Sequence, residues 1–186
     1  MGAIYLWWIG GGEVEERLME EVRAQVERVL RYPARVWTSP ERPVDTLDPA
    51  RGQHLSTRIL RWLLAARPPE ADRVVAVTDV DLFIPVLTFV FGEAQLRGSA
   101  AVVSTARLRS NPGAPSADPR VVTARVAKEC IHELGHTFGL IHCDDPRCVM
   151  ARSVSVPQVD AKGGALCRDC RIRLEESRRE VGGPHG

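Results

Sequence analysis

The chain has 186 residues, of which 44% are hydrophobic, and its formal net charge is +1. This length and apolar content predict one domain with a substantial core. The near-zero net charge gives no basis for nucleic acid or an anionic membrane as the main partner, and no run of about eighteen apolar residues indicates a transmembrane helix. The first nine residues lack the basic leader of a signal peptide, so we expect a cytoplasmic protein. The oligomeric state stays open.

The N-terminal half alternates between strand and helix patterns. Residues 4–9 form an apolar run that ends in three glycines, which predicts a buried strand. Apolar residues at helical spacing predict amphipathic helices at 13–30 and 55–66. Further strands are expected at 36–38 and 73–78, with a proline-rich loop at 40–49. This alternation favours a mixed sheet with helices packed against it.

Two aspartates, Asp79 and Asp81, follow the strand predicted at 73–78. Paired carboxylates can bind a cation or transfer protons, but aspartates at strand ends more often form turns and caps. We favour the turn interpretation. Another strand is expected within 98–108, and a loop at 111–118. Asp118 followed by Pro119 is an N-cap with proline at the first helical position, so a helix is predicted from Pro119 to about residue 138. A last helix is expected at 171–180, before a frayed tail.

The run from His132 to His142 reads HELGHTFGLIH and carries the chemistry of the chain. On a helix, His132 and His136 share a face and can bind one metal ion. Glu133 can reach a metal-bound water without binding the metal. Gly139 can end the helix with a positive φ and bring His142 round as the third ligand. The pattern HExxHxxGxxH is the metzincin signature, and it predicts a catalytic zinc site with one position open for water.

Four cysteines form a second constellation after the histidines, Cys143, Cys148, Cys167 and Cys170. Two closely spaced pairs separated by a loop suit a closed, structural zinc site with four thiolates. The alternative is two disulfides, which we consider less consistent with a chain that shows no sign of secretion. The fifth cysteine, Cys130, is interpreted as a small buried thiol.

Together these motifs resemble those of the archaemetzincin family. The resemblance rests on the run from His132 to His142, on Cys143, Met150, Asp160, Lys162 and the other three cysteines, and on upstream segments at 79–83, 89–94 and 101–109. It implies a compact, metzincin-like α+β fold, with a mixed β-sheet, packed helices, an active-site helix and a C-terminal four-cysteine zinc site. Residues 1–186 would form one catalytic domain, with 143–174 as a zinc-knuckle-like portion. If the resemblance holds, residues 99–105 are the candidate edge strand that pairs with an extended peptide.

The resemblance implies a zinc-dependent peptidase, possessing aminopeptidase or other peptidase activity on peptides or small proteins. Two zinc ions per chain are expected, one catalytic and one structural. Glu133 would act as general base, Met150 would lie beneath the histidines, and Arg152 is a candidate oxyanion donor. One alternative is a catalytically silent zinc-binding adaptor or regulator that keeps the fold. A four-cysteine nucleic-acid module ranks third, because it leaves the three histidines unexplained.

Overall fold

A five-stranded mixed sheet is the centre of the fold. The computed structural model describes residues 2–11, 15–111 and 117–181. Its strand order is β2-β1-β5-β8-β7, and only β7 runs antiparallel to its neighbour. The strands are β1 Ala3–Trp8, β2 Ala34–Trp37, β5 Ala71–Thr78, β7 Gly92–Ala94 and β8 Ala100–Ser104. The expected mixed sheet is confirmed.

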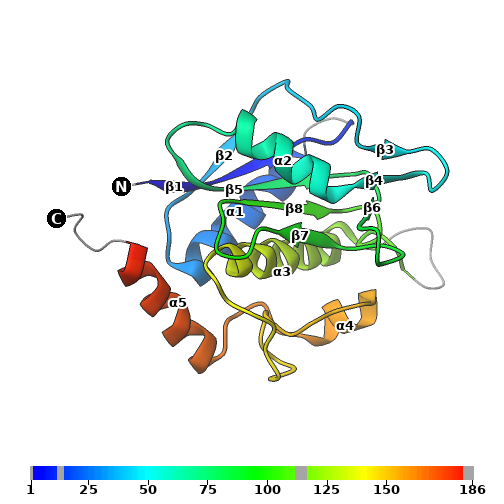
Figure 1. The fold of residues 1–186 in the computed structure, drawn as a ribbon. Coiled ribbons are helices and arrows are strands. Elements are labelled where there is room, and N and C mark those ends of the chain that lie inside the picture. Colours follow the sequence, from blue (N-terminus) through cyan, green and yellow to red (C-terminus); the bar gives the residue numbers. More distant parts are fainter. Residues whose placement is uncertain (1, 12–14, 112–116, 182–186) are drawn as a thin grey trace.

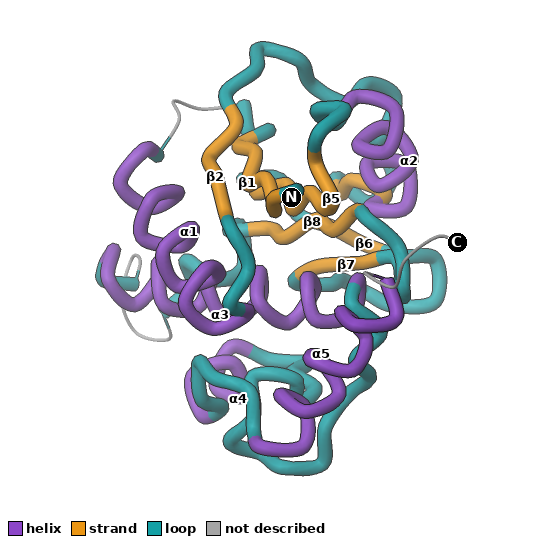
Figure 2. Tube along the Cα trace, turned by 90° about the vertical axis from the view of Figure 1, so that its left-hand side faces the viewer, coloured by secondary structure: helices purple, strands orange, loops and turns teal. Residues whose placement is uncertain are grey.

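Helices cover both faces of this sheet (Figures 1 and 2). Helices α1 Glu16–Leu30 and α3 Pro119–Thr137 lie on one face, and α2 Ser56–Ala66 lies on the other. Successive side chains of β1 alternate between the two cores: Leu6 packs in the cluster with α1 and α3, and Trp7 packs in the cluster with α2. Burial on both faces explains why β1 is a continuous apolar run. The described part of α1 agrees with its predicted range, whose residues 13 and 14 lie outside the described residues.

A small second sheet was not predicted. It joins β3 Leu47–Asp48, β4 Gln53–Leu55 and β6 Leu82–Phe83 in the order β3-β4-β6. Strands of two or three residues are too short to show an alternating pattern. The residues expected to form a loop at 40–49 do so until β3 begins.

The chain after α3 folds beneath that helix in Figure 1. It contains α4 Val156–Ala161, which was not predicted, and α5 Arg168–Val181, which begins three residues earlier than expected. Its apolar side chains belong to the same core cluster as α1 and α3, including Leu140, Val149, Met150, Val159, Leu166 and Leu174. The cysteine-rich portion is therefore joined to the sheet domain by a continuous core. The predicted frayed tail lies outside the described residues.

The prediction for the edge strand is wrong. Residues 99–105 were expected to form the edge, but β8 pairs with β5 on one side and with β7 on the other. The strand is also shorter than the predicted range, because residues 105–108 turn away from the sheet. Among the described residues the sheet ends at β7, so the three residues Gly92–Ala94 form the edge beside the active-site helix.

Candidate active site

Helix α3 positions the first three residues of the histidine motif as predicted. Asp118 caps the helix, since its Oδ1 accepts a hydrogen bond of 2.7 Å from the Arg120 N–H, and Pro119 begins it. The helix ends at Thr137, and Gly139 turns the chain with a φ of +91°. A left-handed residue of this kind favours glycine, and the turn carries His142 back towards the helix.

The structure brings His132, His136 and His142 together. Each offers one ring nitrogen, and these nitrogens lie within 4.8 Å of one another. The Nε2 atoms of His132 and His136 are 3.2 Å apart. Ligands at 2.0–2.1 Å from a tetrahedral zinc are separated by about 3.3–3.4 Å. The spacing of these imidazoles therefore fits one zinc ion.

Backbone carbonyls fix which ring nitrogen of these histidines faces the site. The Nδ1 of His132 lies 2.9 Å from the Val149 carbonyl oxygen, and the Nδ1 of His136 lies 2.8 Å from that of Leu140. A carbonyl can only accept, so Nδ1 carries the proton and donates it in both cases. The Nε2 lone pair is then free for a metal, which is the usual arrangement of metal-binding histidines.

Burial keeps these imidazoles neutral. It lowers the pKa of His132 to about 3, with the charge of Lys162 as the next contribution. Burial also lowers the pKa values of His136 and His142. A metal binds the neutral ring, so the site is prepared for metal binding at neutral pH.

Glu133 is buried beside the histidines. Burial raises its pKa well above the ordinary value for glutamate, and the nearby carboxylate of Glu129 acts in the same direction. Its side chain packs against the backbone of Gly92, where a Cβ would lie 2.7 Å from the Glu133 Cγ. Because Gly92 has no side chain, the Glu133 side chain has room to lie against β7. The contact was missed from the sequence, although a glycine within a strand is a signal of close approach.

The three histidines and Glu133 line a cleft of about 370 Å³. The opposite wall is β7 with the segment 84–91, and residues 152–154 complete the rim, including the predicted oxyanion donor Arg152. An extended peptide could lie along the free side of β7 and present a carbonyl to the histidines. The edge position expected for 99–105 belongs to this shorter strand.

Met150 lies directly beneath the active-site helix. It is fully buried, and a Cβ on Gly135 would lie 2.5 Å from its Sδ. Only a glycine at this helical position admits the sulfur so close to the helix axis. Met150 therefore has the place expected for a hydrophobic floor under the histidines.

The four cysteines also converge. Their Sγ atoms lie within 4.8 Å of one another, and those of Cys143 and Cys167 are 3.7 Å apart. Thiolates at about 2.3 Å from a tetrahedral zinc are separated by about 3.7–3.8 Å, whereas a disulfide requires about 2.05 Å. All four are free thiols, so the geometry favours zinc over the disulfide alternative. Cys130 is a fifth free thiol, buried in the core as predicted.

Two backbone contacts connect the cysteine cluster to the histidines. The carbonyl that orients His132 belongs to Val149, the residue after Cys148. The Cys143 N–H donates to the Met150 carbonyl oxygen over 3.0 Å. The loop held by the cysteines is therefore the loop that supports the first histidine and the methionine.

A buried ion pair supports the same loop. Lys162 Nζ lies 2.9 Å from Glu129 Oε1, and the two side chains are only 2% and 4% exposed. Lys162 also donates to the Ala151 carbonyl oxygen over 3.3 Å. The pair fastens the segment after Met150 to α3, one helical turn before Glu133. No sequence pattern indicated this partner for Lys162.

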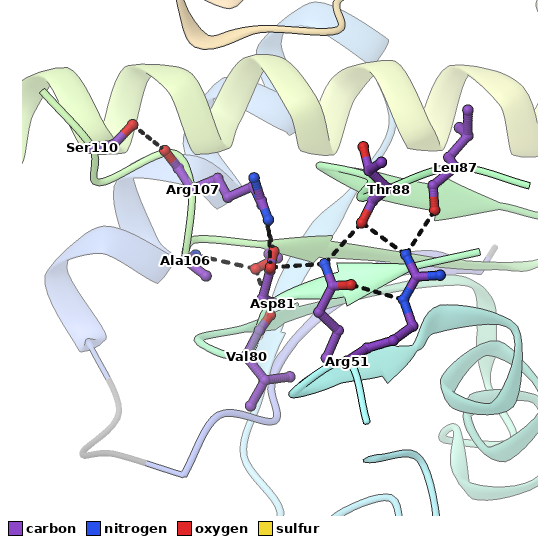
Figure 3. A network of polar contacts seen from close by, with 10 residues as sticks. Arg51, Val80, Asp81, Leu87, Thr88, Ala106, Arg107 and Ser110 are labelled. Carbon is purple, nitrogen blue, oxygen red and sulfur yellow. Dashed lines mark hydrogen bonds and ion pairs between the residues drawn. The ribbon is translucent and has the colours of Figure 1, made fainter. Parts of the chain in front are cut away.

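Asp79 and Asp81 do not line the cleft, and their carboxylates accept hydrogen bonds from Gly11 and Arg107, which are distant in the chain. The carboxylate of Asp81 accepts hydrogen bonds from both Nε and Nη2 of Arg107 at 2.8 Å, and another from Gln53 (Figure 3). Although burial opposes the effect, these hydrogen bonds lower the pKa of Asp81. Arg51 extends the network by donating to the carbonyl oxygens of Leu87 and Thr88. Arg51, Gln53 and Arg107 were not singled out from the sequence as a group.

This network holds the outer wall of the cleft. The carbonyl groups that Arg51 binds belong to the segment 84–91, and the guanidinium of Arg107 also lies 4.0 Å from the ring centroid of Phe89. The segment has little regular structure, apart from an isolated bridge between Leu82 and Val90. Side-chain hydrogen bonds therefore take the place of a sheet ladder in fixing it.

Known proteins are similar to this chain in both sequence and fold. Residues 12–176 match peptidase family M54. The archaemetzincin of Methanopyrus kandleri is 41% identical over 159 residues, which cover 84% of this chain and 87% of that protein. Its crystal structure has a TM-score of 0.84 at 36% identity, covering 95% and 94% of the two chains. The archaemetzincin of Archaeoglobus fulgidus, solved with malonate, has a TM-score of 0.77 at 32% identity, covering 91% and 98%.

Fold and site together define a zinc metallopeptidase of the metzincin type. A zinc-dependent peptidase from Methanocorpusculum labreanum also has this fold, with a TM-score of 0.80 at 30% identity over 92% of this chain and 99% of that one. The chain belongs to peptidase family M54, with the archaemetzincins as its relatives. None of the helices in the described part is long and apolar enough to cross a membrane.

Proposed function

We propose that the chain hydrolyses peptide bonds at a zinc ion held by His132, His136 and His142, with Glu133 as general base. The single observation that carries the proposal is the convergence of three neutral imidazoles beside one buried carboxylate, in a cleft whose far wall is a strand edge. Zinc in this site would polarise a peptide carbonyl and lower the pKa of a water towards about 7.

Three parts of the chain would then have separate roles in hydrolysis. Glu133 takes the proton of the attacking water and passes it to the nitrogen of the leaving amine. β7 aligns the extended substrate through its free backbone groups. Arg152, on the rim of the cleft, is the candidate for stabilising negative charge on the carbonyl oxygen. Both amino- and endopeptidase action are compatible with this arrangement.

We further propose that the cysteines hold a second, structural zinc, and that residues 1–186 act as one catalytic domain. The 3.7 Å sulfur spacing and the shared core support these two points. Five free thiols also suit a reducing compartment, so a cytoplasmic location is part of the proposal.

The test is zinc content and peptidase activity for the parent, Glu133→Gln and His136→Ala. We expect two zinc ions per chain in the parent and in Glu133→Gln, and one in His136→Ala. Only the parent should cleave a peptide library. Two zinc ions without cleavage of any peptide would support a silent zinc-binding regulator. One zinc ion in all three proteins would remove the catalytic site from the proposal.

A further inference from the structure

A second cavity, of about 890 Å³, lies behind the active-site helix and shares no lining residue with the catalytic cleft. Its walls come from the β7–β8 turn, the end of α3, the starts of β1 and β5, and α5. These elements meet on the side of Figure 1 where β1 begins. The proposed peptidase chemistry uses none of its residues.

This arginine cavity is strongly basic in an otherwise neutral chain. It is lined by four arginines and two acidic residues, Arg73, Arg97, Arg178, Arg179, Asp72 and Glu175. Four positive charges less two negative ones leave +2. Of the two acids, Asp72 accepts a hydrogen bond from the Tyr32 hydroxyl within the cavity, and Glu175 lies 4.0 Å from Arg31, which is outside the lining.

Two of the guanidinium groups lie over aromatic rings. The guanidinium of Arg73 lies 3.6 Å from the ring centroid of Phe138, and that of Arg178 lies 4.9 Å from the centroid of Tyr32. Stacking fixes the plane of a guanidinium and leaves its N–H edge available for an oxyanion. These two arginines are therefore oriented before any ligand arrives.

The cavity also contains unused hydrogen-bond donors. Nε of Arg73 is buried and has no hydrogen-bond partner within the described ranges. Among the residues that the structure describes, none forms an ion pair with the side chain of Arg97 or Arg179. A buried donor without an acceptor is costly, and an anionic ligand in the cavity would offset that cost.

We propose that the arginine cavity binds a small phosphate-bearing molecule. A phosphate monoester carries about −1.5 to −2 charges at pH 7 and three acceptor oxygens, which match the +2 charge and the unpartnered donors of the arginines that line the cavity. The cavity of about 890 Å³ is larger than a phosphate needs, so an organic group attached to the phosphate fits in it as well. The site does not depend on the proposed peptidase activity.

The test is calorimetric titration at constant ionic strength with inorganic phosphate, adenosine monophosphate and adenosine. Phosphate and the monophosphate should bind saturably, and adenosine should not. Tighter binding of the monophosphate would identify an organic phosphate as ligand, and equal binding would identify free phosphate. Binding of adenosine as tight as that of the monophosphate, or no saturable binding of either phosphate, would overturn the proposal.

Variants locate the binding site. Arg97→Gln combined with Arg179→Gln changes two exposed side chains and leaves both aromatic stacks intact. The loss of each charged hydrogen bond weakens binding about tenfold or more, so the double variant should weaken it about a hundredfold or more. The matched control, Arg28→Gln with Arg61→Gln, should bind as the parent does. Equal weakening in both double variants would overturn the proposal.

One more variant separates this site from the metal. His136→Ala, which removes a proposed catalytic ligand, should keep its affinity for phosphate. Loss of binding in that variant would place the phosphate at the catalytic metal and refute the arginine cavity as its site.

Discussion

Replacing Gly92 with alanine tests the contact between the edge strand and the proposed general base. The new Cβ would lie 2.7 Å from Glu133 Cγ, 2.9 Å from Glu133 Oε1 and 2.7 Å from the Val102 carbonyl oxygen. Ordinary contacts of this kind begin at 3.4 Å, so the atoms must separate by about 0.7 Å (3.4 − 2.7). Val102 lies in β8, which is paired on both sides, so the contact with its carbonyl oxygen displaces the short edge strand β7, and the contact with Glu133 displaces that side chain.

The expected effect is on catalysis more than on folding. A displacement approaching 1 Å in a catalytic group costs about a hundredfold in rate, whereas overpacking costs about 1–3 kcal/mol in stability. We therefore expect kcat of Gly92→Ala on a peptide substrate to fall about a hundredfold, with unchanged zinc content and a modestly lower free energy of unfolding in urea.

Gly11→Ala is the matched control, because a Cβ at that position meets no atom within 4 Å. It should keep the parent's kcat. If Gly92→Ala also kept kcat within about twofold at full zinc occupancy, then Glu133 would either not be displaced or not be the general base. β7 would then have no role in positioning the Glu133 side chain for catalysis.

Three other perturbations have expected outcomes. Cys170→Ala should lower the zinc content by more than one ion at limiting zinc, because the loop that orients His132 loosens with the cysteine site; a loss of one ion only would contradict this coupling. Lys162→Met should lower the free energy of unfolding in urea by about 3–5 kcal/mol, because it leaves the Glu129 carboxylate buried and unpaired. Adding Glu129→Leu should restore much of the lost stability. A loss below about 1 kcal/mol in Lys162→Met would contradict a stabilising role for this ion pair. In zinc-free protein, the free energy of unfolding should fall as the pH drops from about 6.5 towards 3. In this range His132 is protonated in the unfolded state but not in the folded state, where its pKa is about 3. His132→Gln should therefore reduce the dependence of stability on pH.

The histidine and cysteine clusters could be predicted from the sequence because their members occur at short, characteristic spacings. Four residues on a helix place His132 beside His136 whatever surrounds them, and Gly139 supplies the turn to His142. The long elements were predictable for the same reason, since β1 and α1 carry their patterns over six and fifteen residues. Most turns of α1 and most residues of β1 contribute apolar side chains to the core, so the pattern of each element extends over its whole length.

The walls of the cleft could not be predicted in this way. β7 has three residues and is defined by its pairing with β8, so the edge was assigned to the longer apolar strand instead. The segment 84–91 is held by Arg51, which is 36 residues away from Leu87. The partners of Glu129 and Asp81 also come from distant positions, 33 and 26 residues along the chain. Pairings of this kind depend on the tertiary fold and leave no trace in local spacing.

The orientation of His132 and His136 depends on backbone atoms, and these atoms connect the two proposed zinc sites. Side-chain identity sets which rings are present, but the carbonyl groups of Val149 and Leu140 decide which nitrogen each ring turns towards the other histidines and the proposed metal. The position of the Val149 carbonyl follows from the loop that begins at Cys143 and is closed by Cys167 and its neighbours. A conservative change at either residue would keep the carbonyl, whereas the loss of one cysteine ligand would let the loop move it. The orientation of the His132 ring should therefore change more when Cys170, 38 positions away, is replaced than when Val149 is replaced by another residue.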